Sequence, residues 1–164
     1  ASKLASGKTV QEHIDEANAT LGEKIELRRL AVLDGSPVGL YLHRTSPDLP
    51  PQVGVVVALT KANPETGKDI AQHIAAFSPQ YLKREEVPAD LVENERRVAE
   101  ETARNEGKPD AAIAKITEGR VTGFFKDVTL LEQAFAKDQK KSVQQVLDEA
   151  GTTVSAFHRF RVGQ

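Results

Sequence analysis

The stretch Val53-Gly-Val-Val-Val-Ala-Leu59 decides the fold of this 164-residue chain, because it is apolar on both of its faces. A strand of this kind is covered on both sides, so we expect it to lie at the centre of a sheet. A second strand is predicted over residues 153–162, with Val154, Ala156, Phe160 and Val162 on one face.

The segment in front of the central strand predicts a hairpin. Residues 38–43 alternate Val38, Leu40 and Leu42 with Gly, Tyr and His, which favours a half-buried strand with these three side chains inward. Residues 25–33 are rich in β-formers and are predicted to pair with it through a turn at residues 34–37.

Three helices carry start signals in the sequence. Thr9-x-x-Glu12 and Ser142-x-x-Gln145 are capping boxes, and Asn63-Pro64 is typical of a helix start. Gly22 and Gly151 stand where the first and the last of these helices should stop.

Residues 87–125 differ from the rest in pattern. Two polar helices with narrow apolar stripes are separated by Glu106-Gly-Lys-Pro109, and Glu93–Arg97 and Glu100–Arg104 are predicted i,i+4 ion pairs. This pattern indicates an antiparallel hairpin that projects from the body. The predicted fold class is therefore α+β: a small antiparallel sheet covered by helices, with an inserted helical hairpin as a coiled-coil arm.

The composition excludes several classes of function. The chain has no cysteine, so disulfides, thiolate nucleophiles and Cys-based zinc sites are ruled out, and the absence fits a reducing cytoplasm. A net charge of -2 argues against a chain-wide basic field for nucleic acid. No apolar run reaches the roughly 20 residues that span a bilayer.

Few residues suggest catalysis. The four histidines His13, His43, His73 and His158 are not spaced as metal ligands, and no serine nucleophile motif occurs. His73 is predicted to be a packed, satisfied histidine, and His158 is predicted to be a structural residue on the apolar face of the last strand. His43 stands at a strand end, where functional residues are more common. An enzyme is therefore disfavoured, and a protein that acts by touching another protein is favoured.

The chain resembles bacterial elongation factor Ts, in particular its actinobacterial members. The matching stretches are Leu21-Gly-Glu-Lys-Ile-Glu-Leu-Arg-Arg-Leu-Ala31, Tyr41-Leu-His43, Gly54-Val-Val-Val57, Ile70-Ala-Gln-His-Ile-Ala-Ala76, Gly107-Lys-Pro109, Glu118-Gly-Arg120 and Phe157-His-Arg-Phe-Arg-Val-Gly163. They follow the family's order across residues 9–164.

The resemblance implies a domain organisation. Residues 1–24 match the end of the first core subdomain, 25–86 and 126–164 match the second core subdomain, and 87–125 match the coiled-coil arm. The family's N-terminal domain and its Thr-Asp-Phe-Val motif are missing, and no Asp-Phe dipeptide occurs anywhere in the chain. The sequence therefore looks like a C-terminal fragment of the family.

The resemblance also implies a function without covalent chemistry, cofactor or metal: guanine-nucleotide exchange on elongation factor Tu, in the cytoplasm. Its partner-binding positions fall on Leu21, His43 and the corner formed by Phe135 and Ala136. The family's sheet is a dimer surface in some relatives, so a homodimer is a further expectation, whereas nucleic acid and membrane are not expected partners.

Two alternatives stay open at this point. Because the Asp-Phe motif is missing, the chain could be a structural or dimerisation module without exchange activity of its own. A small hydrolase that uses His43 is the remote alternative.

Overall fold

The computed structural model describes residues 3–33 and 37–163 of the chain, which divides into two compact units, Ala1–Val32 and Leu33–Gln164. The first unit holds helix α1 (Val10–Leu21). Both bonds of the predicted capping box between Thr9 and Glu12 are present, and Gly22 ends the helix at a φ of 68°. The first unit runs beyond residue 24, and the family-based boundary there stays a prediction.

The predicted strand over residues 25–33 is wrong, because these residues form no strand in the structure. Their apolar side chains are mostly exposed, with Leu30 at 81% and Val32 at 74%. Arg28 and Arg29 interrupt both faces of the segment, so it offers no apolar side to a sheet. The predicted turn at 34–37 lies mostly outside the described residues, since only Pro37 is described.

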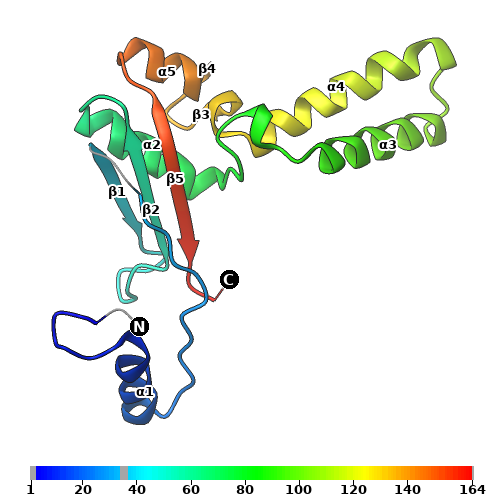
Figure 1. Cartoon of the computed structure of the whole chain (residues 1–164). Coiled ribbons are helices and arrows are strands. Elements are labelled where there is room, and N and C mark those ends of the chain that lie inside the picture. Colours follow the sequence, from blue (N-terminus) through cyan, green and yellow to red (C-terminus); the bar gives the residue numbers. More distant parts are fainter. Residues whose placement is uncertain (1–2, 34–36, 164) are drawn as a thin grey trace. The chain divides into compact units, whose positions relative to one another are not determined.

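The second unit is built on an antiparallel sheet of three strands in the order β1-β2-β5 (Figure 1). Strand β2 (Val53–Leu59) lies in the centre, between β1 (Val38–His43) and β5 (Val154–Arg161). The prediction that residues 53–59 form the central strand is thus confirmed. The expected cover on both faces is not, because α2 packs on one face and Leu40 and Leu42 are more than half exposed on the other. The partner of β1 is β2, which follows it in the chain, instead of the segment before it.

Helix α2 (Pro64–Phe77) packs on one face of this sheet. Asn63 caps it as predicted, by accepting a hydrogen bond from the Thr66 amide. The approach is close because Gly39 of β1 lies against Gly67 of α2, where a Cβ on Gly39 would stand 2.6 Å from the Gly67 carbonyl oxygen.

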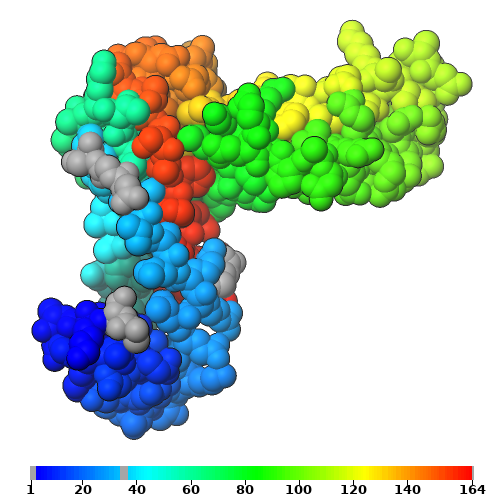
Figure 2. Space-filling view, in the orientation of Figure 1, coloured from blue at the N-terminus to red at the C-terminus, as the bar shows by residue number. Residues whose placement is uncertain are grey.

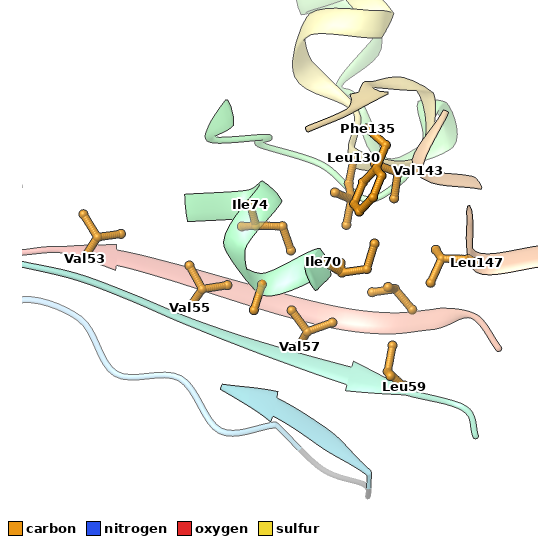
Figure 3. Close-up of a cluster of buried hydrophobic side chains, with 12 residues drawn as sticks. Val53, Val55, Val57, Leu59, Ile70, Ile74, Leu130, Phe135, Val143 and Leu147 are labelled. Carbon is orange, nitrogen blue, oxygen red and sulfur yellow. The ribbon is translucent and has the colours of Figure 1, made fainter. Parts of the chain in front are cut away.

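The core fills the space between the sheet, α2 and a smaller layer of short elements (Figure 3). That layer consists of η2 (Leu130–Glu132), β3 (Ala134–Phe135), β4 (Asp138–Ser142) and α5 (Val143–Glu149). The predicted capping box of Ser142 and Gln145 is present. The completely buried side chains include Ile70, Ile74, Leu130 and Leu147.

The predicted inward face of residues 38–43 is wrong. Val38, Leu40 and Leu42 are 48%, 64% and 55% exposed, while Gly39 and Tyr41 face α2. The register places the three exposed residues opposite Ala58, Val56 and Gly54 on the second face of the sheet. The helix can come close to β1 only on the face that carries Gly39, so Val38, Leu40 and Leu42 are turned to the opposite face.

Strand β5 carries a related correction. Its pairing with β2 shifts register between Ala58 and Leu59. Val154 therefore faces the core, whereas Ala156, His158 and Phe160 lie opposite Ala58, Val56 and Gly54 on the other face. Val162 lies beyond the strand and is 77% exposed, so the four predicted residues do not share one face.

The arm consists of α3 (Ala89–Asn105) and α4 (Asp110–Val128), which pack along each other (Figure 2). A short 3-10 turn, η1 (Arg84–Glu86), leads into it. The buried contact is made mostly by small or medium side chains. These are Ala99, Ala103, Ile113, Thr117 and Val121. Val98 of α3 is 41% exposed.

Several ion pairs lie on the surface of the arm. Glu100 and Arg104 pair as predicted, but Arg97 pairs with Glu101 instead of Glu93. Arg96 and Glu118 join the two helices, and Arg120 of α4 binds Glu106 in the loop at 2.9 Å. Long side chains on a helix choose among several neighbours one turn away, which is why the single pairing was mispredicted.

Candidate partner-binding site

His43 is the last residue of β1 and is exposed. Its register partner is Val53, so it lies on the same face as Tyr41, which is the face that α2 covers. The Tyr41 hydroxyl and the Nδ1 atom of His43 are 3.0 Å apart, and this hydrogen bond orients the imidazole ring. His43 is exposed because it stands at the end of the strand, beyond the part of this face that α2 covers.

The corner formed by Phe135 and Ala136 combines a buried and an exposed residue. Phe135 is 5% exposed and lies beside Leu130 and Val143 in the core (Figure 3). Ala136 is exposed in the turn between β3 and β4. The Phe135 side chain is therefore unavailable to a partner, which narrows the predicted contact to Ala136 and the backbone of the corner.

The corner is attached to α2 by His73. The Ala136 amide donates a hydrogen bond to Nδ1 of His73 at 3.1 Å, and Nε2 of His73 lies 2.9 Å from Oε1 of Gln133. The His73 ring also stacks on Phe77 and Phe135, with centroids 4.8 and 5.9 Å away. Burial lowers the pKa of His73 below its ordinary value of 6.5, although the bond to Gln133 opposes the shift.

A shallow groove of about 580 Å³ lies next to the corner. Its walls combine the half-exposed ring of Phe77, the side chain of Gln133 and three lysines, Lys126, Lys140 and Lys141. Lys141 pairs with Glu149 at 2.7 Å. The groove gives the surface around the corner an apolar ring and a border of mixed charge, because Asp127 and Glu132 line it beside the lysines. Sequence reasoning did not identify the groove because its residues come from four separate segments.

Leu21 belongs to the first unit. It is the last residue of α1 and is 63% exposed, although its residue type favours burial. In the second unit, His43 stands beside Val53 at one end of the sheet, while Phe135 lies over Ile70 (Figure 3). Within the second unit, His43 and the corner are therefore separate patches.

The uncovered face of the sheet, on the side away from α2, is an apolar surface that the alternation of residues 38–43 did not predict, although the family resemblance implies a dimer surface on the sheet. It carries three exposed side chains of β1, namely Val38, Leu40 and Leu42. Exposed aliphatic residues in adjacent positions on a sheet are typical of a contact surface. The sequence of β1 alone does not identify this face, because its alternation is equally consistent with either side being inward.

The base of the arm is held by Arg84 of η1. Its guanidinium makes a two-pronged ion pair with Glu132 of η2 and lies 4.6 Å from the centroid of the Phe125 ring. The bond to Glu132 raises the pKa of Arg84. A planar guanidinium that engages a carboxylate and an aromatic ring together restrains the direction in which the arm leaves the body.

Metal binding and membrane insertion find no support in the part of the chain that the structure describes. No group of three or more His, Cys, Asp or Glu residues there is arranged to hold a metal ion. None of the helices in residues 3–33 and 37–163 combines the length and hydrophobicity of a membrane span.

Comparison with known proteins matches residues 1–164 to the family described as elongation factor Ts. The chain is 65% identical over 163 residues to elongation factor Ts of Streptomyces griseus, covering 99% of this chain and 59% of the relative. It is 63% identical to that of Acidothermus cellulolyticus and 60% identical to that of Thermobifida fusca, covering 98% of this chain and 58% of each relative. The predicted resemblance is confirmed, and the chain spans under two thirds of these relatives.

Proposed function

The chain belongs to the elongation factor Ts family, and on that premise we propose that it is the partner-gripping part of a translation factor that binds elongation factor Tu and promotes GDP release. The observation that supports this most is the exposure of two matched contact positions, each of which is held by a hydrogen bond. His43 is held by Tyr41 at the end of β1, and Ala136 is held by His73 in the turn after β3.

The proposed mechanism is a coupling of two binding equilibria and involves no covalent step. A factor that binds the empty GTPase more tightly than the nucleotide-bound form lowers nucleotide affinity by the same factor. We propose that no cofactor or metal takes part on the side of this chain. His43 and the corner would supply attachment, and the arm would supply a second, distant contact.

Exchange by this chain alone should be weak. The family's Asp-Phe motif disturbs the nucleotide site of the partner, and these 164 residues contain no Asp-Phe dipeptide. Calorimetric titration should therefore detect binding to nucleotide-free elongation factor Tu, while stopped-flow release of a fluorescent GDP analogue is accelerated far less than by a full-length factor. Absence of binding would contradict the proposal, and full acceleration would contradict the role assigned to the missing motif.

His43→Ala tests the attachment residue. Because His43 is exposed, its removal should leave the melting temperature almost unchanged and weaken binding to elongation factor Tu about five- to 150-fold. His13→Ala is a matched control, because His13 is an exposed histidine outside the predicted contact positions. A lower melting temperature with unchanged affinity would show that His43 is structural.

A second candidate function is a dimerisation module without exchange activity. The uncovered sheet face favours it, because Leu40 and Leu42 are more than half exposed side by side with Val38. A second copy could cover these residues by packing its own sheet face to face. Light scattering should then find a dimer that Leu40→Glu converts to a monomer without loss of folding; a monomeric parent chain would exclude this candidate.

A further inference from the structure

His73 is a polar residue at a position that packing alone would give to an apolar side chain. It is 0% exposed on α2, between the core residues Ile70 and Ile74. A buried imidazole costs free energy unless both ring nitrogens find partners, whereas leucine would fill similar space without that requirement. What histidine adds at this position is therefore its two hydrogen bonds.

These two bonds determine the proton position on the ring. The Ala136 amide can only donate, so Nδ1 of His73 must accept and carries no proton. The proton then lies on Nε2, which donates to Oε1 of Gln133. A neutral ring with this tautomer satisfies both contacts, and the lowered pKa of His73 agrees with it.

The two bonds end on different elements of the second unit. The Nδ1 bond ends on the exposed turn at Ala136. The Nε2 bond ends on Gln133, whose own amide donates to the carbonyl oxygen of Asp127 in the last turn of α4 at 2.7 Å. One buried side chain thus links α2 to the corner and to the base of the arm.

The corner needs such a link because its own ladder is weak. Strand β3 has only two residues, and its register with β4 shifts between Ala134 and Phe135. A hairpin this short and irregular has little stability of its own. The buried Phe135 side chain anchors the residue before Ala136 against α2. After Ala136, the turn is tied to α2 by the ion pair between Lys137 and Asp69, whose side chains are 54% and 22% exposed, so this pair contributes little.

We propose that His73 is a positioning residue, which holds Ala136 in the geometry that a protein partner binds. This inference rests on the proposed function, because it assigns to the corner the contact with elongation factor Tu. His73 itself is buried and touches no partner; it acts through the Ala136 amide and, by way of Gln133, through the end of α4.

Two substitutions separate the bonds of His73. In His73→Asn, the amide oxygen stands as many bonds from Cα as Nδ1 does and can still accept from Ala136. In His73→Gln, the amide nitrogen stands as far out as Nε2 and can still donate to Gln133. Both variants lose the aromatic ring, so their packing losses are similar. Lys137→Gln is the control for the exposed ion pair.

Amide hydrogen exchange by NMR on the free chain should show Ala136 protected in the wild type, in His73→Asn and in Lys137→Gln. In His73→Gln, Ala136 should exchange at least about tenfold faster. Nitrogen shifts of His73 should report the Nε2-protonated tautomer. Unchanged protection of Ala136 in His73→Gln would overturn the inference.

Titration with nucleotide-free elongation factor Tu completes the test. His73→Asn should bind within about threefold of the wild type and His73→Gln about tenfold more weakly, at matched stability. Equal loss in both variants would reduce His73 to a structural core residue. If the wild type failed to bind, the proposed function would fall, whereas normal wild-type binding with unaffected His73→Gln would overturn only the positioning role.

Discussion

The body of the second unit and its helical arm bury different kinds of side chains. The body closes over Ile70, Ile74, Leu130 and Leu147, which are all 0% exposed and come from distant parts of the chain. The arm closes over smaller side chains, of which Ala99 and Ala103 are the most buried on α3. Its helices otherwise present charged residues to solvent.

The body and the arm obtain their stability from different interactions. Removing a large buried side chain leaves a cavity and costs several kcal/mol, while a contact between small side chains has less to lose. The arm relies more on local helix formation and on pairs one turn apart. The two parts should therefore respond differently to substitution, to pH and to salt.

The largest effect is expected where the body is tightest, at Gly39. In Gly39→Ala the new Cβ would meet the backbone of Gly67 at 2.6 Å, so the sheet and α2 must separate. We expect a loss of about 2–4 kcal/mol in the free energy of unfolding. Chemical denaturation followed by circular dichroism would measure it.

The matched substitution in the arm is Gly119→Ala. A Cβ on Gly119 meets nothing within 4 Å, and the residue is exposed inside α4. Alanine should stabilise the helix by about 0.5–1 kcal/mol. Similar losses at Gly39 and Gly119 would remove the distinction between the two parts.

The next effect is a pH dependence that belongs to the body. Burial depresses the pKa of His73 in the folded state, so below pH 6.5 the unfolded chain takes up the proton first. Stability should be constant above that pH and fall as the pH drops from 6.5 towards the folded-state pKa, by at most about 1.4 kcal/mol per pH unit.

Denaturant melts of the wild type and of His73→Asn across this pH range isolate the contribution of His73, because the variant lacks the imidazole at position 73 and keeps all other titrating groups. The slopes of the free energy of unfolding against pH should differ between the two proteins by no more than the uptake of one proton accounts for. Parallel stability curves for the two proteins would mean that His73 is protonated equally in the folded and unfolded states.

A smaller effect on the body is expected from replacing residues 92–114 of the arm by a short Gly/Ser linker. The contacts of Arg84 with Glu132 and Phe125 at the base would remain. The body should still melt cooperatively, with its free energy of unfolding changed by no more than about 1 kcal/mol. Loss of the cooperative transition would show that the arm is part of the core.

The smallest effect is expected at the ion pair between Arg96 and Glu118 on the arm. Both side chains are well exposed, at 44% and 61%. Glu118→Gln should cost about 0.2–1 kcal/mol at low salt and almost nothing at high salt. Hydrogen exchange of the α3 amides at the two salt concentrations measures it, and a large salt-independent loss would contradict the surface role.

The sequence alone was sufficient for the features that depend on neighbouring residues. The capping boxes at Thr9 and Ser142 and the cap at Asn63 all formed as predicted, because each is closed within three residues. The central strand at 53–59 was also predicted, since a short run that is apolar on both faces is typical of a strand in the middle of a sheet. Family resemblance added the candidate contact residues.

Only the tertiary structure decided which face of the sheet is covered and which contact residues are exposed. Leu40 and Leu42 alternate like core residues, yet the approach of Gly67 to Gly39, 28 positions away in the numbering, turns them outward. Phe135 is buried because it packs in the core with residues of α2, η2 and α5, while Ala136 beside it is exposed. Alternation along a strand is symmetric between its two faces, so the choice depends on what packs there from elsewhere in the chain.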